Sequence, residues 1–370
     1  MYHHRSISDY PDAADFLTSI GVVVEDQDQH IHAGRNPCWK GRASDGELVF
    51  VKIEELIDPK ASVDGNRSRA LTFFDMRVDS AELKNFVSAI DPRAISPDGR
   101  IQVYPWQSSV SGSDLLTEGK LDRAVVQGVA ASIQRLHAAG TEARDIAGPH
   151  IAESLPGTYG IPALPVELIP TLSGGQLCAW ALMHNDKQLM ETARATVLAE
   201  YRASDQTYIH GDLRIDQVLL DEADGNRFSA IIDWESFGRG DPARDTGTFM
   251  GNVLNIIATT EVWNVKRTVA EPDWQEQIRR AVECARPYLI DFLSAYFGKQ
   301  RVPISEMRDH IVRAIRFAGW HQFDRLLASA DSAALISPLT KAMAGVGRTF
   351  LLFPHDIDEE LGLTHACASF

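Results

Sequence analysis

The spacing of hydrophobic residues changes at about residue 106. Before this point they form short runs, such as Trp39–Arg42 and Leu48–Ile53, which flank an Asp-Gly turn. After it they recur every three or four positions over long stretches, as in Leu121–Ala139. This contrast predicts an α+β chain with a small β-rich N-terminal lobe, residues 1–106, and a large, mostly helical C-terminal lobe, residues 107–370.

The same periodicities place the individual elements. A Pro- and Gly-rich stretch over 147–175 interrupts them and is typical of a functional loop or an insertion. Predicted helices cover 10–20, 67–76, 80–90, 121–139, 176–201, 274–298, 305–328 and 333–352, and predicted strands cover 22–24, 30–33, 39–42, 48–53, 101–104, 217–220 and 228–232.

Composition excludes several classes of protein. The 370 residues are 44% hydrophobic, yet no apolar run approaches the roughly 20 residues of a membrane span. The 36 basic and 51 acidic residues give a net charge of −15, which repels nucleic acid and anionic lipid. The four cysteines are far apart, and the N-terminus has no apolar signal region. We therefore expect a cytoplasmic protein with no nucleic-acid or membrane partner.

The most informative segment is residues 208–245. It contains two carboxylates, Asp212 and Asp233, with two short strands between them that are spaced to pair as a hairpin. Pairing brings Asp212, Gln217 and Asp233 to one end of the hairpin. Such hard oxygen ligands suit Mg²⁺ held partly by substrate phosphates, while one carboxylate can instead accept a proton from an attacking hydroxyl. The alternative is a surface hairpin with ordinary Asp turns.

The full pattern resembles the catalytic core of the aminoglycoside phosphotransferase and choline-kinase-like group. It consists of His-Gly-Asp, an amide five residues after the Asp, Ile-Asp-Trp-Glu and Gly-Asp-Pro-x-x-Asp. Leu136–Gly140 resembles the group's Leu-His-x-x-Gly, and Phe292–Gly298 resembles its later Tyr-containing helix. The resemblance spans roughly residues 30–300. It implies a bilobal protein-kinase-like fold and ATP-dependent transfer of the γ-phosphate to a hydroxyl.

The resemblance also implies roles for the residues that match the motif. Asp212 would orient or deprotonate the acceptor hydroxyl, and Asp233 would hold Mg²⁺ between the β- and γ-phosphates. His210, Asp241 and Asp245 would brace the catalytic loop without taking part in the chemistry.

The N-terminal lobe supplies the expected ATP-binding residues. Lys52 lies in an apolar strand, where a half-buried lysine needs an anionic partner such as the α- and β-phosphates; the alternative is an edge-strand lysine that faces water. Gly34 and Asn36 belong to a segment placed like a nucleotide-covering loop. Val103 and Tyr104 belong to the hinge near residues 102–107, which is either an adenine-binding surface or a packed linker.

Two positions depart from the family pattern. Gln217 stands where the group has a metal-binding Asn, so its amide oxygen is one methylene further from the backbone. Bacterial maltokinases resemble this chain in having Gln here. Ser68 aligns with the helix Glu that pairs with the strand Lys in the group, and Glu54, Glu55 or Asp75 is a possible substitute.

Arg214 lies two residues after the predicted base and is a candidate catalytic residue. It is placed either to steady the transferred phosphoryl group or to bind an acidic acceptor. The alternative is a salt bridge with Asp216 or another carboxylate of the loop.

The acceptor is not encoded in a motif and is expected to contact residues 147–200 and the helices after 246. The candidates are an aminoglycoside, a sugar, or a Ser or Thr of a precursor peptide. The segment 212–217 resembles phosphotransferase-like proteins of lanthipeptide and thioamidated-peptide pathways, which implies a possible partner lyase. The alternative function is a pseudokinase that binds nucleotide or peptide and scaffolds a partner enzyme.

Overall fold

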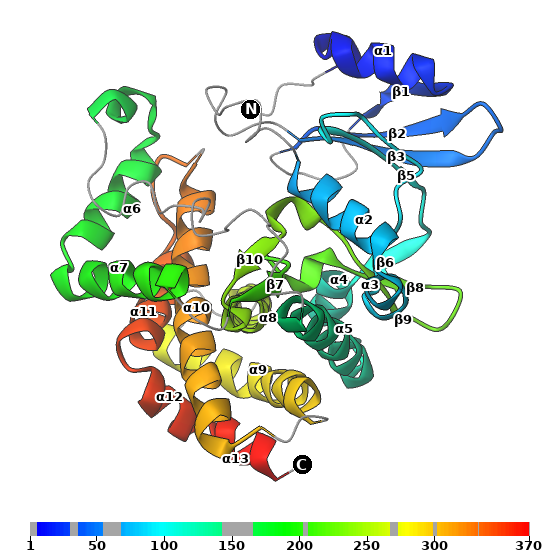
Figure 1. The fold of residues 1–370 in the computed structure, drawn as a ribbon. Helices are drawn as coiled ribbons and strands as arrows, with labels where there is room; N and C mark the ends of the chain where they lie inside the picture. Colours follow the sequence, from blue (N-terminus) through cyan, green and yellow to red (C-terminus); the bar gives the residue numbers. More distant parts are fainter. Residues whose placement is uncertain are drawn as a thin grey trace.

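The protein has two lobes, a small antiparallel sheet at one end and a body of helices at the other (Figure 1). This confirms the predicted α+β, two-lobed architecture. The structure, a computed structural model, describes residues 6–29, 36–54, 68–142, 166–202, 206–266, 273–298, 302–331 and 333–369. The predicted strand 30–33 lies outside the described residues, as does most of the irregular stretch 147–175.

The N-terminal sheet has its own core. Alternate residues of its strands, among them Trp39, Val49 and Val51, are almost fully buried and pack with Leu17 of the first helix. The strand order is β1-β2-β3-β5-β4, and each neighbouring pair is antiparallel. The elements are η1 (Ile7–Asp9), α1 (Pro11–Ser19), β1 (Val22–Gln29), β2 (Cys38–Ala43), β3 (Leu48–Ile53), β4 (Ala94–Ile95) and β5 (Ile101–Pro105).

Two helices that fall within the predicted N-terminal lobe pack into the large hydrophobic core of the C-terminal lobe. Helix α2 (Arg69–Asp79) begins at Ser68, whose hydroxyl accepts a hydrogen bond from Leu71 N–H, and α3 (Ala81–Phe86) follows it. The Phe73 ring stacks on Trp234, with centroids 3.7 Å apart and planes 5° apart. Both helices thus belong to the large hydrophobic core of the C-terminal lobe, not to the core of the sheet.

The C-terminal lobe is built from long helices around this large core. Helix α5 (Arg123–Glu142) continues past residue 139, the predicted end of this helix, and contains Gly140. A Cβ at Gly140 would lie 2.2 Å from the backbone nitrogen of Tyr208, so glycine allows this close approach. The other long helices are α8 (Pro242–Lys266), α9 (Trp274–Phe297), α10 (Ile304–Ala330) and α11 (Pro338–Leu352), and shorter ones are α4 (Gly112–Thr117), α12 (Pro354–Leu361) and α13 (Leu363–Ala368).

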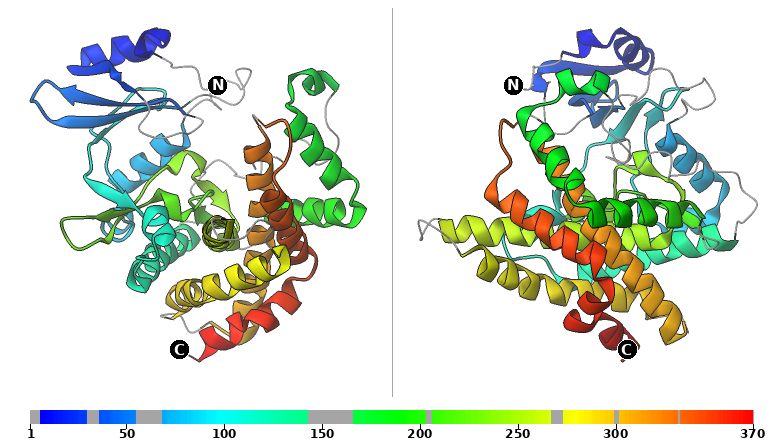
Figure 2. Two further views of the ribbon diagram at one scale, coloured as in Figure 1. Left: turned by 180° about the vertical axis from the view of Figure 1, so that it is seen from behind. Right: turned by 90° about the vertical axis from the view of Figure 1, so that its left-hand side faces the viewer.

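The predicted helix 176–201 is two helices. The break falls at Asn185 and Asp186, where Asp186 accepts a hydrogen bond from Leu189 N–H at the start of the second helix. Helix α6 (Gly174–His184) extends to the height of the N-terminal sheet in both views of Figure 2. It follows η5 (Val166–Thr171) and precedes α7 (Lys187–Arg202). Similarly, the helix predicted over 333–352 starts only at Pro338.

The predicted hairpin around residues 224–226 is confirmed. Strands β8 (Val218–Asp221) and β9 (Arg227–Ile231) pair antiparallel, and β6 (Ser109–Ser111) adds a third strand that the sequence did not predict. A second small sheet, also unpredicted, joins β7 (Thr207–Ile209) to β10 (Gly238–Gly240). The short helices η6 (Ile215–Gln217) and η7 (Trp234–Ser236) lie beside these strands.

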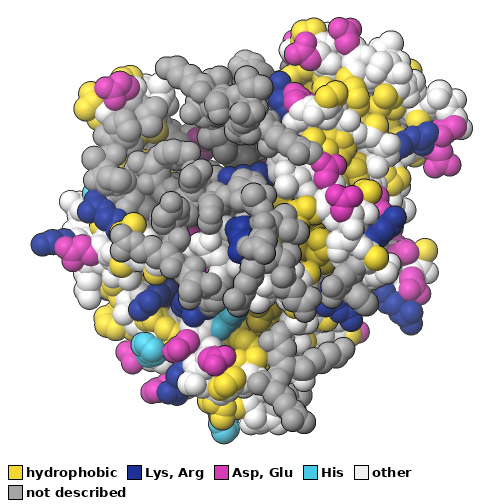
Figure 3. Space-filling view, in the orientation of Figure 1, with side chains coloured by type: hydrophobic (Ala, Val, Ile, Leu, Met, Phe, Trp, Pro, Cys, Tyr) yellow, Lys and Arg dark blue, Asp and Glu magenta, His cyan; other side chains and the backbone are white. Residues whose placement is uncertain are grey.

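Acidic and basic side chains are interspersed on the described surface visible in Figure 3. The excess negative charge therefore forms no single continuous patch on that part of the surface. Among the described residues, no helix combines the length and the apolar character that a bilayer crossing requires.

The aromatic stack between α2 and η7 gives a test of this packing. Replacing Phe73, which is fully buried, with Ala should lower the free energy of unfolding by about 3–5 kcal/mol. Val78 on the same helix is 78% exposed, so Val78→Ala should change it by less than about 0.5 kcal/mol. Urea denaturation measures both values, and equal effects would contradict the packing described here.

Candidate active site

The loop after β7 is held by a buried carboxylate. The two oxygens of Asp245 accept hydrogen bonds from the backbone N–H groups of His210 and Gly211, each at 2.7 Å. His137 Nε2 donates to the same carboxylate over 3.0 Å, and the Tyr296 hydroxyl bonds His137 Nδ1 at 2.7 Å. The segments around His137 and Tyr296 were noted in the sequence only by resemblance. In the fold they fix the loop that carries Asp212.

The other two predicted bracing residues also contact the loop and its support. The His210 ring lies 3.0 Å from the carbonyl oxygen of Ile232, at the start of the segment that carries Asp233. Asp241 accepts a hydrogen bond of 2.8 Å from Arg313 and one of 2.9 Å from Ala243 N–H, which fixes the start of α8. His210 and Asp245 thus contact the backbone of the two motif segments, and Asp241 contacts the start of α8; their bracing roles stay a prediction.

Asp212 lies at the open side of the loop. Burial raises the pKa of its carboxyl group above the ordinary value, while the nearby Arg214 opposes the shift. Arg214 contacts two carboxylates loosely, at 3.6 Å from Asp212 and 3.4 Å from Asp216. Its Nε atom is buried and makes no hydrogen bond. This Nε is the atom that faces Asp212, so the two groups lie at ion-pair distance without forming a hydrogen bond.

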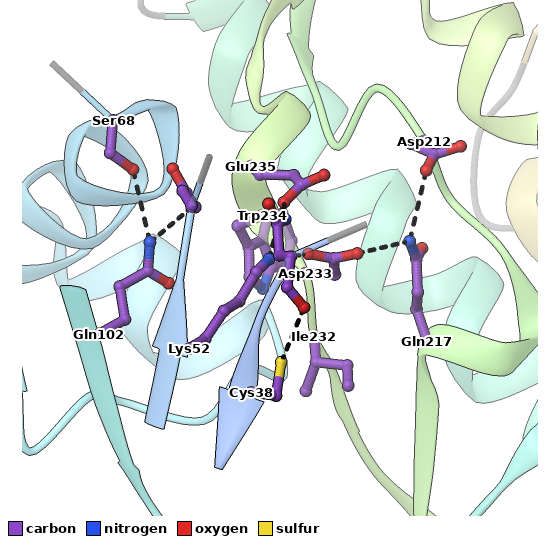
Figure 4. Close-up of polar contacts among 12 residues, drawn as sticks. Cys38, Lys52, Ser68, Gln102, Asp212, Gln217, Ile232, Asp233, Trp234 and Glu235 are labelled. Carbon is purple, nitrogen blue, oxygen red and sulfur yellow. Dashed lines mark hydrogen bonds and ion pairs between the residues drawn. The ribbon is translucent and has the colours of Figure 1, made fainter. Parts of the chain in front are cut away.

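Gln217 lies between the two carboxylates of the motif (Figure 4). Its amide nitrogen is 3.5 Å from Asp212 Oδ2 and 3.3 Å from Asp233 Oδ2. Its amide oxygen accepts the backbone N–H of Arg214 at 3.1 Å. This orientation is the reverse of that expected for a metal ligand, because the oxygen is occupied by Arg214 and the NH₂ group faces the carboxylates.

Asp233 has a left-handed backbone conformation, with φ of 70°, and points its side chain at Lys52. Lys52 lies in β3 with only 11% of its side chain exposed, and it bonds Asp233 and Glu235, the latter at 2.8 Å. Burial favours a neutral Asp233, but the charge of Lys52 outweighs burial and lowers the pKa of Asp233 to about 2. Asp233 is therefore an ionised, hard oxygen donor, which is the chemistry that a divalent cation requires.

Glu235 is a site residue that the sequence analysis did not single out. It accepts hydrogen bonds from both Lys52 and the side chain of Asn36. Ser68 caps α2, so no helix carboxylate stands at that position. Glu54, one of the suggested substitutes, instead accepts a 2.5 Å hydrogen bond from Gln102. The only advance signal for Glu235 was its place in Asp-Trp-Glu.

The expected adenine-binding residues Val103 and Tyr104 lie in β5. Val103 is central in β5, with its side chain fully buried and its carbonyl oxygen bonded to Arg93 N–H. The Tyr104 hydroxyl donates to Gln102 within the same strand, 2.6 Å away. The backbone of Val103 is thus used by the sheet, which favours the packed-linker alternative for this part of the hinge. Gly34 lies outside the described residues.

A small cavity of about 30 Å³ lies beside Asp212. Its walls include Trp320, His321 and Asp324, which α10 carries within about one turn. Burial and the charge of Arg325 lower the pKa of His321 to about 3, so this ring is neutral, and its buried Nε2 makes no hydrogen bond. Burial alone would raise the pKa of Asp324, but the charge of Arg325 outweighs burial. The pKa is therefore lowered and the carboxylate is charged. No sequence signal marked these residues, because their position depends on how α10 packs on α8.

Comparison with known proteins finds a match to one protein family. The model of the phosphotransferase enzyme family matches residues 80–276. Viomycin phosphotransferase of Streptomyces vinaceus is 29% identical over 133 residues, which cover 36% of this chain and 42% of that protein. Acyl-CoA dehydrogenase family member 11 of Gallus gallus is 25% identical over 134 residues, which cover 33% of this chain and 17% of that protein. The chain thus spans less than half the length of either relative.

A solved structure shows the fold over nearly the whole chain. An amicoumacin kinase in complex with AMP-PNP, Ca²⁺ and Ami superposes with a TM-score of 0.56 at 14% sequence identity. The match covers 93% of this chain and 95% of that one.

Asp245 gives the site a pH-dependent test. Burial raises its pKa, but hydrogen bonds and charge from His137 and the Gly211 N–H outweigh burial and lower it below the ordinary 3.8. Because the folded-state pKa is the lower one, the ionised carboxylate stabilises the fold above pH 3.8 and loses this effect as the pH falls. Asp245→Asn should therefore cost about 3 kcal/mol at pH 7 and much less below pH 3.8.

Denaturation curves at several pH values measure this difference. Asp79→Asn, a change at an exposed position on α2, is the control and should leave the curves nearly unchanged. A loss of stability that is the same at every pH would contradict the anchoring role of the ionised carboxylate.

Proposed function

The chain belongs to the phosphotransferase enzyme family, and we propose that it moves the γ-phosphate of ATP to a hydroxyl group of an amine-bearing acceptor. The observation that carries this proposal is the convergence of Lys52, Asp233, Gln217 and Asp212 in one chain of contacts across the two lobes. One end of this chain is suited to nucleotide and metal, and the other to an acceptor hydroxyl.

The nucleotide end contains one buried cation and two carboxylates. Lys52 faces both Asp233 and Glu235, and these charges raise the pKa of Lys52 well above its ordinary value in spite of burial. A bound nucleotide would offer phosphate oxygens to Lys52 and leave the Asp233 carboxylate to a divalent cation. We take this cation to be Mg²⁺, because phosphate-bridging sites with one or two carboxylates are its usual setting. Nucleotide and cation together would supply the phosphoryl group and neutralise its charge.

The acceptor end is the cavity beside Asp212. Asp212 is close enough to Gln217 and Arg214 to be held in one orientation, so it can accept the proton of a hydroxyl that enters the cavity. The cavity admits only a small group, so the remainder of the acceptor would lie outside it. Arg325 bonds only Oδ2 of Asp324, which leaves Oδ1 for a ligand, and Trp320 adds an aromatic ring, a pair that favours an ammonium group.

This chemistry favours an aminoglycoside or an amine-bearing peptide over a neutral sugar. The relative named viomycin phosphotransferase supports the inclusion of viomycin among the compounds tested. A partner lyase is proposed only with the peptide acceptor, and a scaffolded partner enzyme only with the pseudokinase alternative. The choice of acceptor distinguishes these two cases.

The deciding experiment is ATP turnover by the purified protein with Mg²⁺. The acceptor panel contains aminoglycosides, viomycin, choline, maltose and Ser/Thr-rich peptides, and mass spectrometry reads the gain of one phosphate. Transfer to an amine-bearing acceptor supports the proposal. Transfer to maltose alone would overturn the acceptor assignment. No transfer, with ATP still raising the melting temperature, would favour the pseudokinase alternative.

Substitution of the predicted base separates catalysis from binding. Asp212→Asn should lower kcat by about 10²–10⁴-fold, because general-base assistance is lost while the shape of the side chain is retained. The shift in melting temperature caused by ATP should persist. Asp221→Asn, at the exposed end of β8, is the matched control. Wild-type turnover by the Asp212 variant would show that another group accepts the proton.

Asp324 tests the acceptor class. Asp324→Asn should raise KM for an amine-bearing acceptor by about 10–100-fold, the loss expected for a charged hydrogen bond. KM for ATP should not change, because Asp324 lies on the acceptor side of Asp212. Asp309→Asn, at an exposed position of the same helix, is the control. An unchanged acceptor KM would exclude Asp324 from recognition.

A further inference from the structure

Gln217 is held in one orientation by its surroundings. It is 3% exposed, and its backbone carbonyl accepts the N–H of Ile232 at 3.0 Å. Its amide oxygen is fixed by the Arg214 N–H. Reversing the amide would set its NH₂ group against that N–H and its oxygen against two carboxylates, so both sides would lose a favourable contact.

The NH₂ group of Gln217 occupies the position where two like charges approach each other. Asp233 has Lys52 on Oδ1 and Gln217 on Oδ2, so each of its oxygens has a donor. Asp212 faces the same Gln217 nitrogen through its Oδ2. With about a quarter of each carboxylate side chain exposed, the repulsion between them is only partly screened by water. A shared donor stabilises both ionised groups and fixes the spacing between them.

We propose that Gln217 is a positioning residue that holds the carboxylates of Asp212 and Asp233 through its NH₂ group, and that it is not a ligand of the metal ion. The extra methylene relative to Asn gives the amide its reach: from the short helix η6 its nitrogen extends to both carboxylates. This inference rests on the proposed roles of Asp212 and Asp233. Gln217 would thereby couple the acceptor end of the site to the nucleotide end.

A double-mutant cycle without metal tests the coupling. Wild type, Gln217→Met, Asp212→Asn and the double variant are melted in EDTA without nucleotide. Met keeps the length of the side chain and removes the donor. Gln217→Met alone should lower the melting temperature by about 2–6 °C. In the Asp212→Asn background this loss should be clearly smaller, because one of the two charges that the NH₂ group stabilises is gone.

An equal loss in both backgrounds would reduce Gln217 to a support for Arg214 and overturn the proposal, as would no loss at all. If the Met variant does not fold, Gln217→Asn serves in its place, since its shorter amide cannot span both carboxylates. Phosphotransfer does not enter this measurement. The proposed function therefore fails separately, if none of the acceptors gains a phosphate.

Metal binding provides the second arm. Binding of Mn²⁺ in the presence of a non-hydrolysable ATP analogue is measured by electron paramagnetic resonance. The dissociation constant of Gln217→Met should stay within about threefold of wild type, while kcat falls and KM for ATP is retained, as expected for a residue that acts through Asp212. Mn²⁺ binding weakened by tenfold or more would identify Gln217 as a ligand and overturn the proposal.

Discussion

The site depends on one buried carboxylate, that of Asp245. Two backbone N–H groups of the catalytic loop point at it, and His137 and Tyr296 fix its orientation from two other helices. Gly211 has a φ of 88°, so the loop is not in a regular strand or helix at that point, and its N–H groups need other acceptors. The Asp245 carboxylate is that acceptor, and because it is ionised it binds N–H groups more strongly than a carbonyl oxygen does. Asp212 follows Gly211 directly, so the hydrogen bonds to Asp245 also fix the position of Asp212.

Much of the architecture follows from the sequence because its signals are local. The Asp-Gly turn, the alternating strands and the hairpin between Asp212 and Asp233 each depend on residues close together in the chain. The break in helix 176–201 was missed, because an apolar periodicity continues across Asn185 and Asp186 while the hydrogen bond that caps α7 does not show in it. The strands β6, β7 and β10 have only three residues each, too short for a periodicity to develop.

The residues of the candidate site also fall into two groups, those that the sequence identified and those that it did not. The residues of the 208–245 motif are close in sequence and were identified together. Glu235 and the residues of α10 were not, because their roles arise from contacts across long sequence separations, such as Lys52 with Glu235. The orientation of the Gln217 amide was likewise beyond the sequence, since it depends on which neighbour takes its oxygen. The pairing of Val103 with strands on both sides of β5 was likewise not visible in the sequence, because β3 and β5 are far apart in the chain.

The membership of α2 in the larger core has a mechanical consequence. Phe73 joins this helix to Trp234, next to Asp233, whereas Lys52 belongs to a sheet with a separate core. Any displacement of the sheet relative to the large core would therefore change the distance between Lys52 and Asp233. Helix α2 contacts both sides, since Phe73 packs on Trp234 and Phe74 packs against Tyr104 of β5, so such a displacement would also act on α2.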